Sequence, residues 1–467
     1  MSRYNSSYLA NEINTLVLKR NARFKIALVY PNSYAIGMSN LGVHSVYDLF
    51  NQSLDVVCER VFFDLKKKQL FSLETGQALK AFDILAFSIS YELDYFYVLK
   101  ILKDLDLLAP AEQRPVRPLL ISGGIVHSFN HRPLAKYCDL IFVGEAEESI
   151  PLLIKRLCEF PNINSLLKKN DFLKSFADVD GFFVPGFSDP RAVKPCFIQD
   201  LNNFPVCSKI ITPDTEFSNT FLVEISRGCP WNCKFCVTSG VCGSFRPRAI
   251  KLLIEQIEQG LKLTPKIGLV GAAVSDYPQI EELVAFLRMK NAKISVSSLR
   301  VETVKHSLLK ALAQSGQNTI TFAPETGSDR LRYFLNKKIS NKQILEIISA
   351  ANNLGIRKVK LYFMIGLLTE EAADVLAIVR LVEAVSEIVF VKVSIGIFVP
   401  KPKTPFADQL MEDKNILFKK IKLLKAELAL LNNVDFNTAN IKEAKIAHLL
   451  SFADENFFQG YFMKNSL

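Results

Sequence analysis

The sequence predicts an α/β protein in which a doubly wound, flavodoxin-like or Rossmann-like domain precedes a partial (β/α)6 barrel of the TIM type and a short helical C-terminal tail. Two observations support this fold class. Short apolar runs alternate with amphipathic stretches in the first 160 residues, and the same alternation returns at Phe221. Between these regions, prolines recur with Asn, Asp and Gly, as in a connector. The expected domains are residues 1–160, a connector over 161–215, the barrel over 216–410 and an extension over 411–467.

The first region contains five candidate strands, each a short apolar run. They cover 24–30, 55–61, 83–90, 118–122 and 139–143, and helical patterns follow over 40–50, 93–105 and 147–157. This alternation is typical of one doubly wound sheet. Gly123-Gly124 and Gly144-Glu145 end two strands at the edge where such sheets bind ligands. These glycines serve either a tight turn or the close approach of a ligand, and the sequence leaves both open.

The second region contains six candidate strands with helical stretches between them. The strands cover 221–226, 267–271, 293–298, 318–323, 358–365 and 391–398, and the helices cover 249–262, 279–289, 301–314, 340–354 and 371–385. Six such repeats favour a partial barrel over an open sheet. The connector is expected to contain one short hairpin around 181–187. A tail helix over 417–431 is expected to pack its apolar face on a neighbouring domain and to leave its lysines in solvent.

The composition is that of a globular protein. Of 467 residues, 49% are hydrophobic and 22% are charged. The longest apolar run, 361–368, is far shorter than the roughly 20 residues of a membrane span. The N-terminus has no apolar stretch of a secretory signal, so we expect a cytoplasmic protein. The formal net charge of +10 permits a phosphate-rich partner such as nucleic acid but does not by itself support one.

Three cysteines, Cys229, Cys233 and Cys236, follow the first barrel strand with the spacing C-x3-C-x2-C. Thiolates are soft ligands, and this tight spacing suits a single iron–sulfur cube. A zinc site would normally add a fourth Cys or His close by, and an electron carrier normally has four cysteinyl ligands. Cys242 is the only near candidate for a fourth ligand. We interpret it as a packed free thiol and leave open a role in an active site.

This loop resembles the signature of the radical S-adenosylmethionine (SAM) superfamily, C-x3-C-x-aromatic-C, with Phe235 at the aromatic position. The resemblance implies that the three cysteines hold a [4Fe–4S] cluster whose open iron binds the amino and carboxylate groups of SAM. In that superfamily an electron from the cluster, delivered by a donor such as flavodoxin or ferredoxin, cleaves SAM to methionine and a 5′-deoxyadenosyl radical. The protein positions these cofactors and excludes water.

The resemblance also implies SAM contacts at the ends of the next two strands. Gly271 and Ala272 stand where the family usually has a Gly-Gly-Glu-like segment. The acidic residue is missing here, so only the backbone role carries over. Ser297, Ser298 and Arg300 end the third strand and suit the ribose and the carboxylate of SAM. For each polar residue the alternative is a helix cap or a surface ion pair.

The later strands carry further family-like segments. Glu325 and Arg330 lie in Ala-Pro-Glu-Thr-Gly-Ser-Asp-Arg, which resembles a Pro-Glu-x-Gly-Ser segment, and they are expected to meet ribose hydroxyls and a carboxylate. Tyr362 lies in a segment that resembles the one beside the adenine, although Leu368 replaces the usual proline. The proline-rich stretch 400–406 resembles segments of cobalamin-dependent radical SAM proteins and of methylthiotransferases that modify transfer RNA.

A doubly wound domain before such a barrel resembles the cobalamin-binding class of the superfamily, and the stretch 27–42 resembles one subgroup of that class. Domains that bind cobalamin through a lower histidine use Asp-x-His-x-x-Gly, but no histidine here has Asp two residues before it. Cobalamin therefore binds with no histidine on cobalt, or the domain no longer binds it. In the first case, the strand ends 30–38, 88–92, 123–124 and 144–148 would line the corrin. His44 is interpreted as a packed or surface residue.

The leading hypothesis is a radical SAM enzyme that performs cobalamin-assisted methyl transfer, or a related radical step, on an unknown substrate. The second is an RNA-modifying enzyme similar to methylthiotransferases. Those enzymes commonly need a second cluster on three N-terminal cysteines, and the wide spacing of Cys58, Cys138, Cys158, Cys196 and Cys207 counts against it. The third is a non-catalytic iron–sulfur redox protein.

Overall fold

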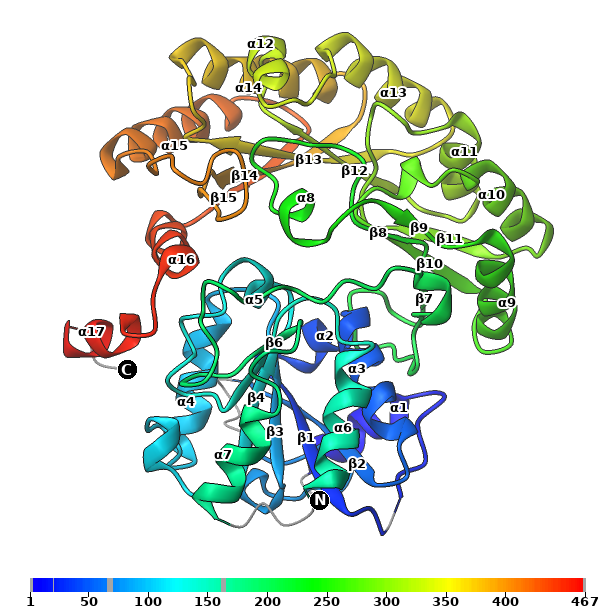
Figure 1. The fold of residues 1–467 in the computed structure, drawn as a ribbon. Helices are drawn as coiled ribbons and strands as arrows, with labels where there is room; N and C mark the ends of the chain where they lie inside the picture. The colour runs from blue at the N-terminus through cyan, green and yellow to red at the C-terminus, as the bar shows by residue number, and fades with distance from the viewer. Residues whose placement is uncertain (1–2, 20, 65–69, 161–164, 465–467) are drawn as a thin grey trace. The chain divides into compact units, whose positions relative to one another are not determined.

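The computed structural model describes residues 3–19, 21–64, 70–160 and 165–464 (Figure 1). The chain divides into two compact units. Unit 1 combines Met1–Thr220 with Leu450–Leu467, and unit 2 is Phe221–Leu449. The start of the expected connector, 161–164, lies outside the described residues.

A six-stranded sheet with the order β2-β1-β3-β4-β5-β6 forms the centre of unit 1. Its strands are β1 Phe24–Tyr30, β2 Val56–Phe62, β3 Ile84–Ser88, β4 Leu119–Gly123, β5 Leu140–Phe142 and β6 Phe182–Phe183. The first five are parallel, in the flavodoxin-like 2-1-3-4-5 order. The doubly wound fold class expected for this region is therefore confirmed. In such sheets ligands bind at the carboxyl edge where the order reverses, here between β1 and β3.

The helices of unit 1 follow its strands in sequence. They are α1 Arg3–Asn11, α2 Tyr34–Gly37, α3 Leu41–Gln52, α4 Asp94–Asp104, α5 Ile125–Phe129, α6 Ser149–Glu159, α7 Leu166–Lys174 and α17 Phe457–Lys464, with short 3₁₀ turns at Leu79–Ala81, Ala111–Gln113 and Leu201–Asn203. The sequence did not predict α7. The short hairpin expected at 181–187 does not form, because β6 pairs with β5 instead. Phe458 of α17 packs edge-on against Tyr95 and Phe96 of α4, so the chain's last helix belongs to this unit.

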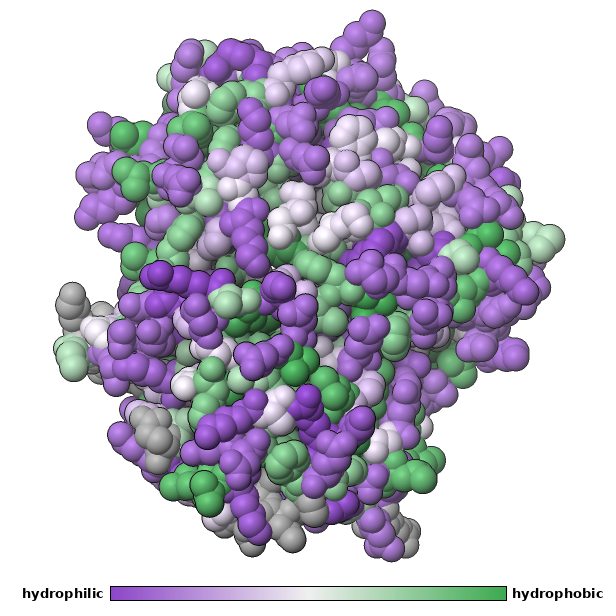
Figure 2. Space-filling view, in the orientation of Figure 1, coloured by the Kyte–Doolittle hydropathy of each residue, from purple (hydrophilic) through white to green (hydrophobic). Residues whose placement is uncertain are grey.

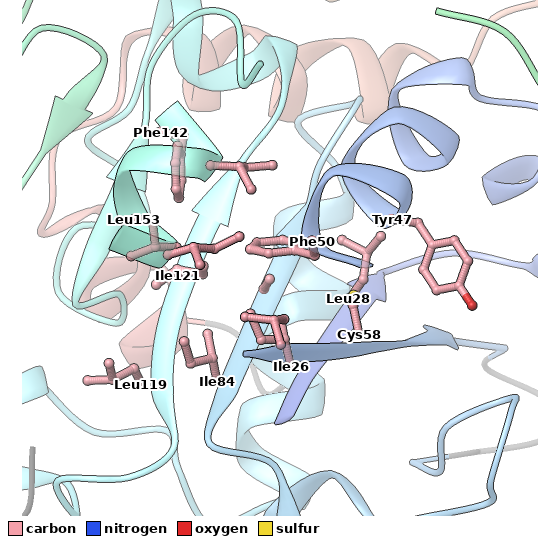
Figure 3. Close-up of a cluster of buried hydrophobic side chains, with 14 of the residues drawn as sticks. Ile26, Leu28, Tyr47, Phe50, Cys58, Ile84, Leu119, Ile121, Phe142 and Leu153 are labelled. Atoms are coloured by element: carbon pink, nitrogen blue, oxygen red, sulfur yellow. The ribbon is translucent and has the colours of Figure 1, made fainter. Parts of the chain in front are cut away.

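The core of unit 1 lies between the sheet and the helices α3 and α6. Figure 3 shows strand residues such as Ile26, Leu28 and Ile121 facing Phe50 of α3 and Leu153 of α6. All five are buried. Truncating a phenylalanine in such a site to alanine costs about 3–5 kcal/mol. This core fixes the strand ends, whose loops carry the exposed edge of the sheet.

Unit 2 consists of parallel βα repeats. Its parallel strands are β7 Phe221–Glu224, β10 Lys266–Val270, β11 Lys293–Val296, β12 Thr319–Glu325, β13 Lys358–Ile365, β14 Phe390–Ile397 and β15 Val434–Thr438, and β8 Ser226–Arg227 pairs antiparallel with β9 Arg246–Pro247. The strand orders are β11-β10-β7 and β12-β13-β14-β15. A parallel bridge between Leu299 and Phe322 joins these two sheets. The result is an open, partial barrel, as expected, with β15 as an additional strand that the sequence did not predict.

Helices line one side of these strands (Figure 1). They are α9 Ile250–Leu261, α10 Ile280–Met289, α11 His306–Gln314, α12 Asp329–Phe334, α13 Asn341–Asn353, α14 Ala372–Ser386 and α15 Lys414–Leu428; α8 Thr238–Val241 and the 3₁₀ turn Val274–Asp276 lie in loops, and α16 Ile441–Phe452 runs across the boundary between the units. The helix expected from residue 301 begins only at His306. The reason is that the Thr303 hydroxyl is held by hydrogen bonds to Ser275 and Asp276, which fix the preceding turn.

In the tail, α15 buries its apolar stripe, represented by Leu417 and Leu424, as expected. One of its lysines differs from the expectation, because Lys420 is only 13% exposed and pairs with two carboxylates. Among the described residues, none of the helices has the length and apolar character needed to cross a membrane. Accordingly, the visible face in Figure 2 is mostly hydrophilic, with scattered apolar residues.

Candidate active site

The cysteine loop follows β7 and β8 at the carboxyl ends of the barrel strands. Gly228 opens the loop with a φ of +77°, and a Cβ there would lie 2.5 Å from the carbonyl oxygen of Ser244. Glycine is therefore required at the position before Cys229. At the end of β7, Glu224 pairs with Arg227 and with the buried Arg248. Although burial acts against ionisation, these two guanidinium groups lower the pKa of Glu224.

The loop is anchored on the segment around α12. The backbone N–H of Lys234 donates to the carbonyl oxygen of Leu335 (3.1 Å), and the Asn336 side chain donates to the carbonyl oxygen of Asn232 (2.8 Å). Phe235, the aromatic position of the motif, packs on an apolar cluster that contains Leu331, Leu335, Leu367, Phe398 and Phe406. Its visible role is thus to hold the loop in place between two cysteines.

The three thiols are neighbours. Cys233 is buried, and Cys229 and Cys236 are half-buried. Burial raises the pKa of Cys229 and Cys233, and the charge of each nearby cysteine adds to this rise. Within the described part of the chain, no three Cys, His, Asp or Glu side chains converge tightly enough to hold a single metal ion. Three soft sulfur donors on one short loop suit a cluster of several irons, in which each thiolate binds a different iron.

Arg300 lies beside the cysteine loop. Its guanidinium is 4.4 Å from the ring centroid of Trp231, pairs with Glu302 and hydrogen-bonds to the thiol of Cys233. The Trp231 ring is held in turn by a hydrogen bond from Nε1 to Asp276 (2.9 Å). Arg300 Nε is buried and has no hydrogen-bond partner among the described residues. An unpartnered buried N–H is costly, so this donor fits an acceptor supplied by a bound group, such as a carboxylate or a sulfide.

The end of β10 shows a second polar atom of this kind. A Cβ added at Gly271 would lie 2.9 Å from Ser226 Oγ, so glycine keeps the two loops in close approach. Ser226 Oγ is buried, again with no partner among the described residues. Ala272 follows at the surface, and Ser297 and Ser298 are exposed at the end of β11. The structure therefore places Gly271 close to Ser226 and Arg300 close to Cys233. The side chains of Ala272, Ser297 and Ser298 are exposed to solvent.

Glu325 and Arg330 have protein partners. Glu325 adopts a φ of +70° and forms an ion pair with Lys337 (3.1 Å). Arg330 pairs with Asp374 and donates to the backbone carbonyl of Thr369 (3.0 Å), which ties the loop after β12 to the loop after β13. Of the two roles considered for Arg330, a SAM contact or an ion pair within the protein, the structure shows the ion pair. Its side chain is half exposed and also meets the loop whose proline is replaced.

Glu325 and Tyr362 line one cavity of about 460 Å³ on the strand side of β12, β13 and β14. The cavity wall also contains the polar residues Ser394 and Asn437 and the glycine Gly396. Its size is within the range of small-molecule sites.

The turn after β13 is held from α15. Glu370 accepts a hydrogen bond from the backbone N–H of Gly366 (2.8 Å), and Lys420 donates to Glu370 and Glu412 (2.6 Å each). Burial raises the pKa of Glu370, and the ammonium of Lys420 acts against that rise. Sequence reasoning missed Lys420, Trp231 and Lys337. Only Trp231 offered a signal, as the single tryptophan of the chain inside the cysteine motif.

The carboxyl edge of the sheet in unit 1 is apolar and exposed. Ile36, Tyr91 and Ile125 follow the adjacent strands β1, β3 and β4, and they are 47%, 47% and 40% exposed. They flank the switch point of the sheet. Large apolar side chains grouped in the open often mark a ligand surface. This edge therefore suits a flat, largely apolar ligand face.

The glycines at this edge serve the protein itself. A Cβ on Gly124 would lie 2.1 Å from the carbonyl oxygen of Ile89, and one on Gly144 would lie 2.3 Å from that of Cys196. The φ angle is +116° at Gly124 and +100° at Gly144, in a region that residues with a side chain rarely adopt. Of the two interpretations left open for these glycines, the tight turn accounts for both without a ligand.

The two histidines near this edge are buried. His44 Nε2 donates to the carbonyl oxygen of Met38 (3.0 Å), and its Nδ1 accepts from the backbone N–H of Lys209 (3.2 Å). Burial lowers the pKa of His44 to about 4. His127 contacts the hydroxyl of Ser122 through Nε2 (2.7 Å), and burial lowers its pKa to about 3. His44 thus has both ring nitrogens occupied and is packed, as interpreted, and is not available to a metal.

Comparisons with known proteins identify the family of this chain. Residues 223–382 match the model of the radical SAM superfamily, and residues 42–185 match the model of the N-terminal region of radical SAM proteins. A protein of Methanocaldococcus jannaschii is 32% identical over 386 residues, which cover 82% of this chain and 78% of that protein. The chain belongs to the radical SAM superfamily, and it is a radical SAM enzyme. This family uses a [4Fe–4S] cluster and SAM, and the donor set found here fits both.

Two further relatives are similar over parts of the chain. An uncharacterised methyltransferase of Pyrococcus horikoshii is 26% identical over 281 residues, 56% of this chain and 57% of that protein. A putative methylthiotransferase of M. jannaschii is 26% identical over 238 residues, 47% of this chain and 52% of that protein. The chain thus spans little more than half the length of either relative.

Two solved structures share the two-unit fold. The radical SAM methyltransferase TsrM of Kitasatospora setae, with tryptophan and a SAM analogue bound, has a TM-score of 0.55 at 11% identity, over 82% of this chain and 75% of that one. The cobalamin-dependent SAM radical enzyme OxsB, with aqua-cobalamin bound, has a TM-score of 0.54 at 15% identity, over 85% of this chain and 56% of that one. At these identities the likeness concerns the fold.

Proposed function

We propose that this radical SAM enzyme uses cobalamin and transfers a methyl group, or performs a related radical step, at an unactivated carbon of its substrate. The observation that carries the proposal is the three-cysteine loop at the carboxyl end of a parallel barrel. Beside it lie buried polar atoms of Arg300 and Ser226 that have no partner in the described part of the chain. The doubly wound sheet of unit 1, with its exposed apolar edge, supports the cobalamin part. The fold shared with TsrM and OxsB is consistent with both parts.

In this proposal Cys229, Cys233 and Cys236 ligate three irons of the cluster. Phe235 keeps the loop on its apolar support, as its packing indicates. Arg300 donates to the Cys233 sulfur and offers its Nε–H to the SAM carboxylate or to a cluster sulfide. When bound, the reduced cluster supplies the electron that cleaves SAM.

The remaining SAM contacts follow the strand ends. The backbone at Gly271 and Ala272 would meet the methionine amino group, and the exposed hydroxyls of Ser297 and Ser298 would meet the ribose. Glu325 is held by Lys337 and lines the cavity, so its carboxylate is positioned to accept hydrogen bonds from ribose hydroxyls.

Two further residues act at the sides of the SAM site. Tyr362 offers its ring to the adenine side of the cavity. Arg330 holds the neighbouring loops together, and half of its side chain is free to meet a carboxylate.

Cobalamin would lie on the edge formed by Ile36, Tyr91 and Ile125, which flank the β1/β3 switch point. With His44 engaged through both nitrogens, we propose that no histidine binds cobalt from below. The electron donor is proposed to be a flavodoxin or a ferredoxin.

The test is to purify the full chain from cobalamin-supplied cells, reconstitute it anaerobically with iron and sulfide, and add SAM and a reductant. We expect a corrinoid chromophore, about four irons per chain, and formation of 5′-deoxyadenosine. A loaded protein that bound four irons but cleaved no SAM would contradict the enzyme assignment. Active SAM cleavage without any corrinoid would contradict the cobalamin part alone.

RNA modification remains a second candidate because of the methylthiotransferase relative and the net charge of +10. The cysteines of unit 1 argue against its usual form. Cys58 and Cys138 are buried within the sheet region, and burial raises the pKa of both thiols. A transfer RNA that bound tightly, with an affinity falling steeply as salt rises, would favour this candidate.

A further inference from the structure

The inner wall of the barrel is unusually polar on the strands β12–β15. Alternate residues of β13, from Val359 to Ile365, are buried on the side that the helices cover. The residues between them point to the opposite side. These are Lys358, Lys360, Tyr362 and Met364. Inward positions of a closed barrel normally hold branched apolar residues that fill it, so this wall is built to face a ligand or solvent.

Two lysines stand side by side on this wall. Lys360 of β13 is in register with Lys392 of β14, and like charges on adjacent strands destabilise a sheet. The charge of Lys392 is compensated by Asp435 of β15, whose carboxylate oxygen lies 3.8 Å from the Lys392 ammonium nitrogen. Lys360 has no carboxylate within ion-pair distance among the described residues. Its ammonium lies 4.7 Å from the ring centroid of Tyr362 instead, so no described carboxylate compensates the charge of Lys360.

This charge lies next to the 460 Å³ cavity, because Tyr362 belongs to the cavity wall. Ser394 and Asn437 are in register with each other on the same layer of the wall. The Ser394 hydroxyl donates to Asn437 Oδ1 (2.8 Å), which leaves the Asn437 amide N–H groups as donors. Glu325, the acidic residue of the cavity, is already neutralised by Lys337.

The cavity therefore has two different ends. Toward the carboxyl ends of the strands lie Glu325, Met364 and Gly396, near the loops that carry the proposed SAM contacts. One layer further inside lie Ser394 and Asn437, in register with Tyr362, whose ring is shared with the adenine side of the proposed SAM site. The ammonium of Lys360 lies 4.7 Å from the centroid of that ring. The first end offers an acceptor and a backbone surface, and the second offers a cation and hydrogen-bond donors.

We propose that the inner end of this cavity binds an anionic group of the substrate, a phosphate or a carboxylate, through Lys360 and the amide of Asn437. This inference rests on the proposed function, since the substrate must lie beside SAM in the same barrel. It goes further by naming the chemical class of the substrate. The substrate is then a small molecule, or the end of a larger one, that carries at least one negative charge at neutral pH.

The experiment measures binding of two probe anions, inorganic pyrophosphate and citrate, to the full chain by isothermal titration calorimetry. We compare the wild type with Lys360→Met, Lys360→Arg and the control Lys342→Met, an exposed lysine of α13. Loss of a charged hydrogen bond should weaken binding about tenfold or more in Lys360→Met. Lys360→Arg, which keeps the charge, should remain close to the wild type, and Lys342→Met should not change. The tighter of the two probes identifies phosphate or carboxylate.

Two outcomes would overturn the inference. One is equal affinity of the wild type and Lys360→Met for both anions, or no binding of either. The other is competitive displacement of the anion by SAM, which would assign this end of the cavity to SAM. The titration uses the cluster-loaded chain and needs no SAM cleavage. It therefore separates failure of this inference from failure of the proposed function, which is read from 5′-deoxyadenosine formed by the wild type.

Discussion

The two units differ in what their motif-like residues contact. In unit 2, Cys233 lies beside an arginine whose Nε–H is buried and unpartnered among the described residues, so the site lacks an acceptor. In unit 1, His44, Gly124 and Gly144 all have close partners within the protein. What remains open in unit 1 is an apolar surface. The proposed cluster side of this enzyme is therefore defined by specific donors, whereas the proposed cobalamin side is defined by exposed apolar area.

The largest expected effect comes from the cysteine loop. Cys233→Ala removes a buried cysteine that we propose as an iron ligand. Reconstituted iron content should therefore fall, and SAM cleavage should drop by more than the 10–100-fold that is typical of changes outside the ligand shell. Iron analysis and 5′-deoxyadenosine formation measure both. Cys242→Ala serves as the control, and it should keep its iron and its cleavage rate. Loss of iron in Cys242→Ala would instead indicate a four-cysteine cluster and remove the open iron from the proposal.

The next effect concerns the apolar edge of unit 1. Replacing Tyr91 and Ile125 together by serine removes apolar area, and each buried side chain of this size contributes about 1.5–3 kcal/mol. We expect the corrinoid retained on purification to fall at least about tenfold. The control is Leu54→Ser, a more exposed apolar residue (83%) of the same unit, between α3 and β2 and away from this edge. Full corrinoid content in the double variant would show that the cofactor lies elsewhere, or that unit 1 does not use this edge.

A smaller effect is expected at Arg300. Arg300→Gln removes a charge and a donor next to Cys233, and hydrogen bonds and positive charge at cluster sulfurs raise the reduction potential. The potential, measured by a redox titration followed by electron paramagnetic resonance, should therefore become more negative. The KM for SAM should rise about tenfold if Nε–H binds the carboxylate.

Two further variants sharpen this reading. Arg300→Lys keeps the positive charge but lacks the planar array of guanidinium donors. Its reduction potential should therefore be closer to that of the wild type than its KM for SAM is. Arg288→Gln, at an exposed arginine of α10, controls for loss of positive charge. An unchanged potential in Arg300→Gln would limit Arg300 to supporting Trp231.

The elements that the sequence predicted well are those defined by local patterns. The strands β1 and β13 have the predicted bounds because their apolar runs or alternation are unbroken. The cysteine loop is equally local, since its three cysteines lie within eight residues. By contrast, β15 was missed because Asp435 and Asn437 face a polar barrel wall, so that the strand has no buried face to reveal it.

Contacts between distant segments could not be predicted. The partners of Arg300 include Trp231, which lies on another loop, and Lys420 of α15 reaches Glu370 after β13. A lysine that pairs inside the protein has the same sequence context as a solvated one, so periodicity alone assigned Lys420 to solvent. The candidate site was therefore predictable as a set of residue types at strand ends. Only the structure shows that, over the residues it describes, Arg300 Nε has no partner and Lys360 has no acidic partner.

The smallest effect tests whether His44 of unit 1 is structural. Its pKa in the folded protein is lowered from 6.5 to about 4, so the unfolded chain binds the proton more readily. The stability that this residue contributes, on the order of 3 kcal/mol, is complete above pH 6.5 and is lost as the pH falls through that range toward 4. Histidine hydrogen–deuterium exchange read by mass spectrometry reports each histidine separately, and the exposed His306 provides the internal control. We expect the pKa of His44 to lie near 4, well below its ordinary value of 6.5, and His44 to exchange slowly. If His44 instead titrated near 6.5 in the corrinoid-free protein and stopped titrating when cobalamin was added, it would be a cobalt ligand after all, and the difference drawn between the two units would not hold.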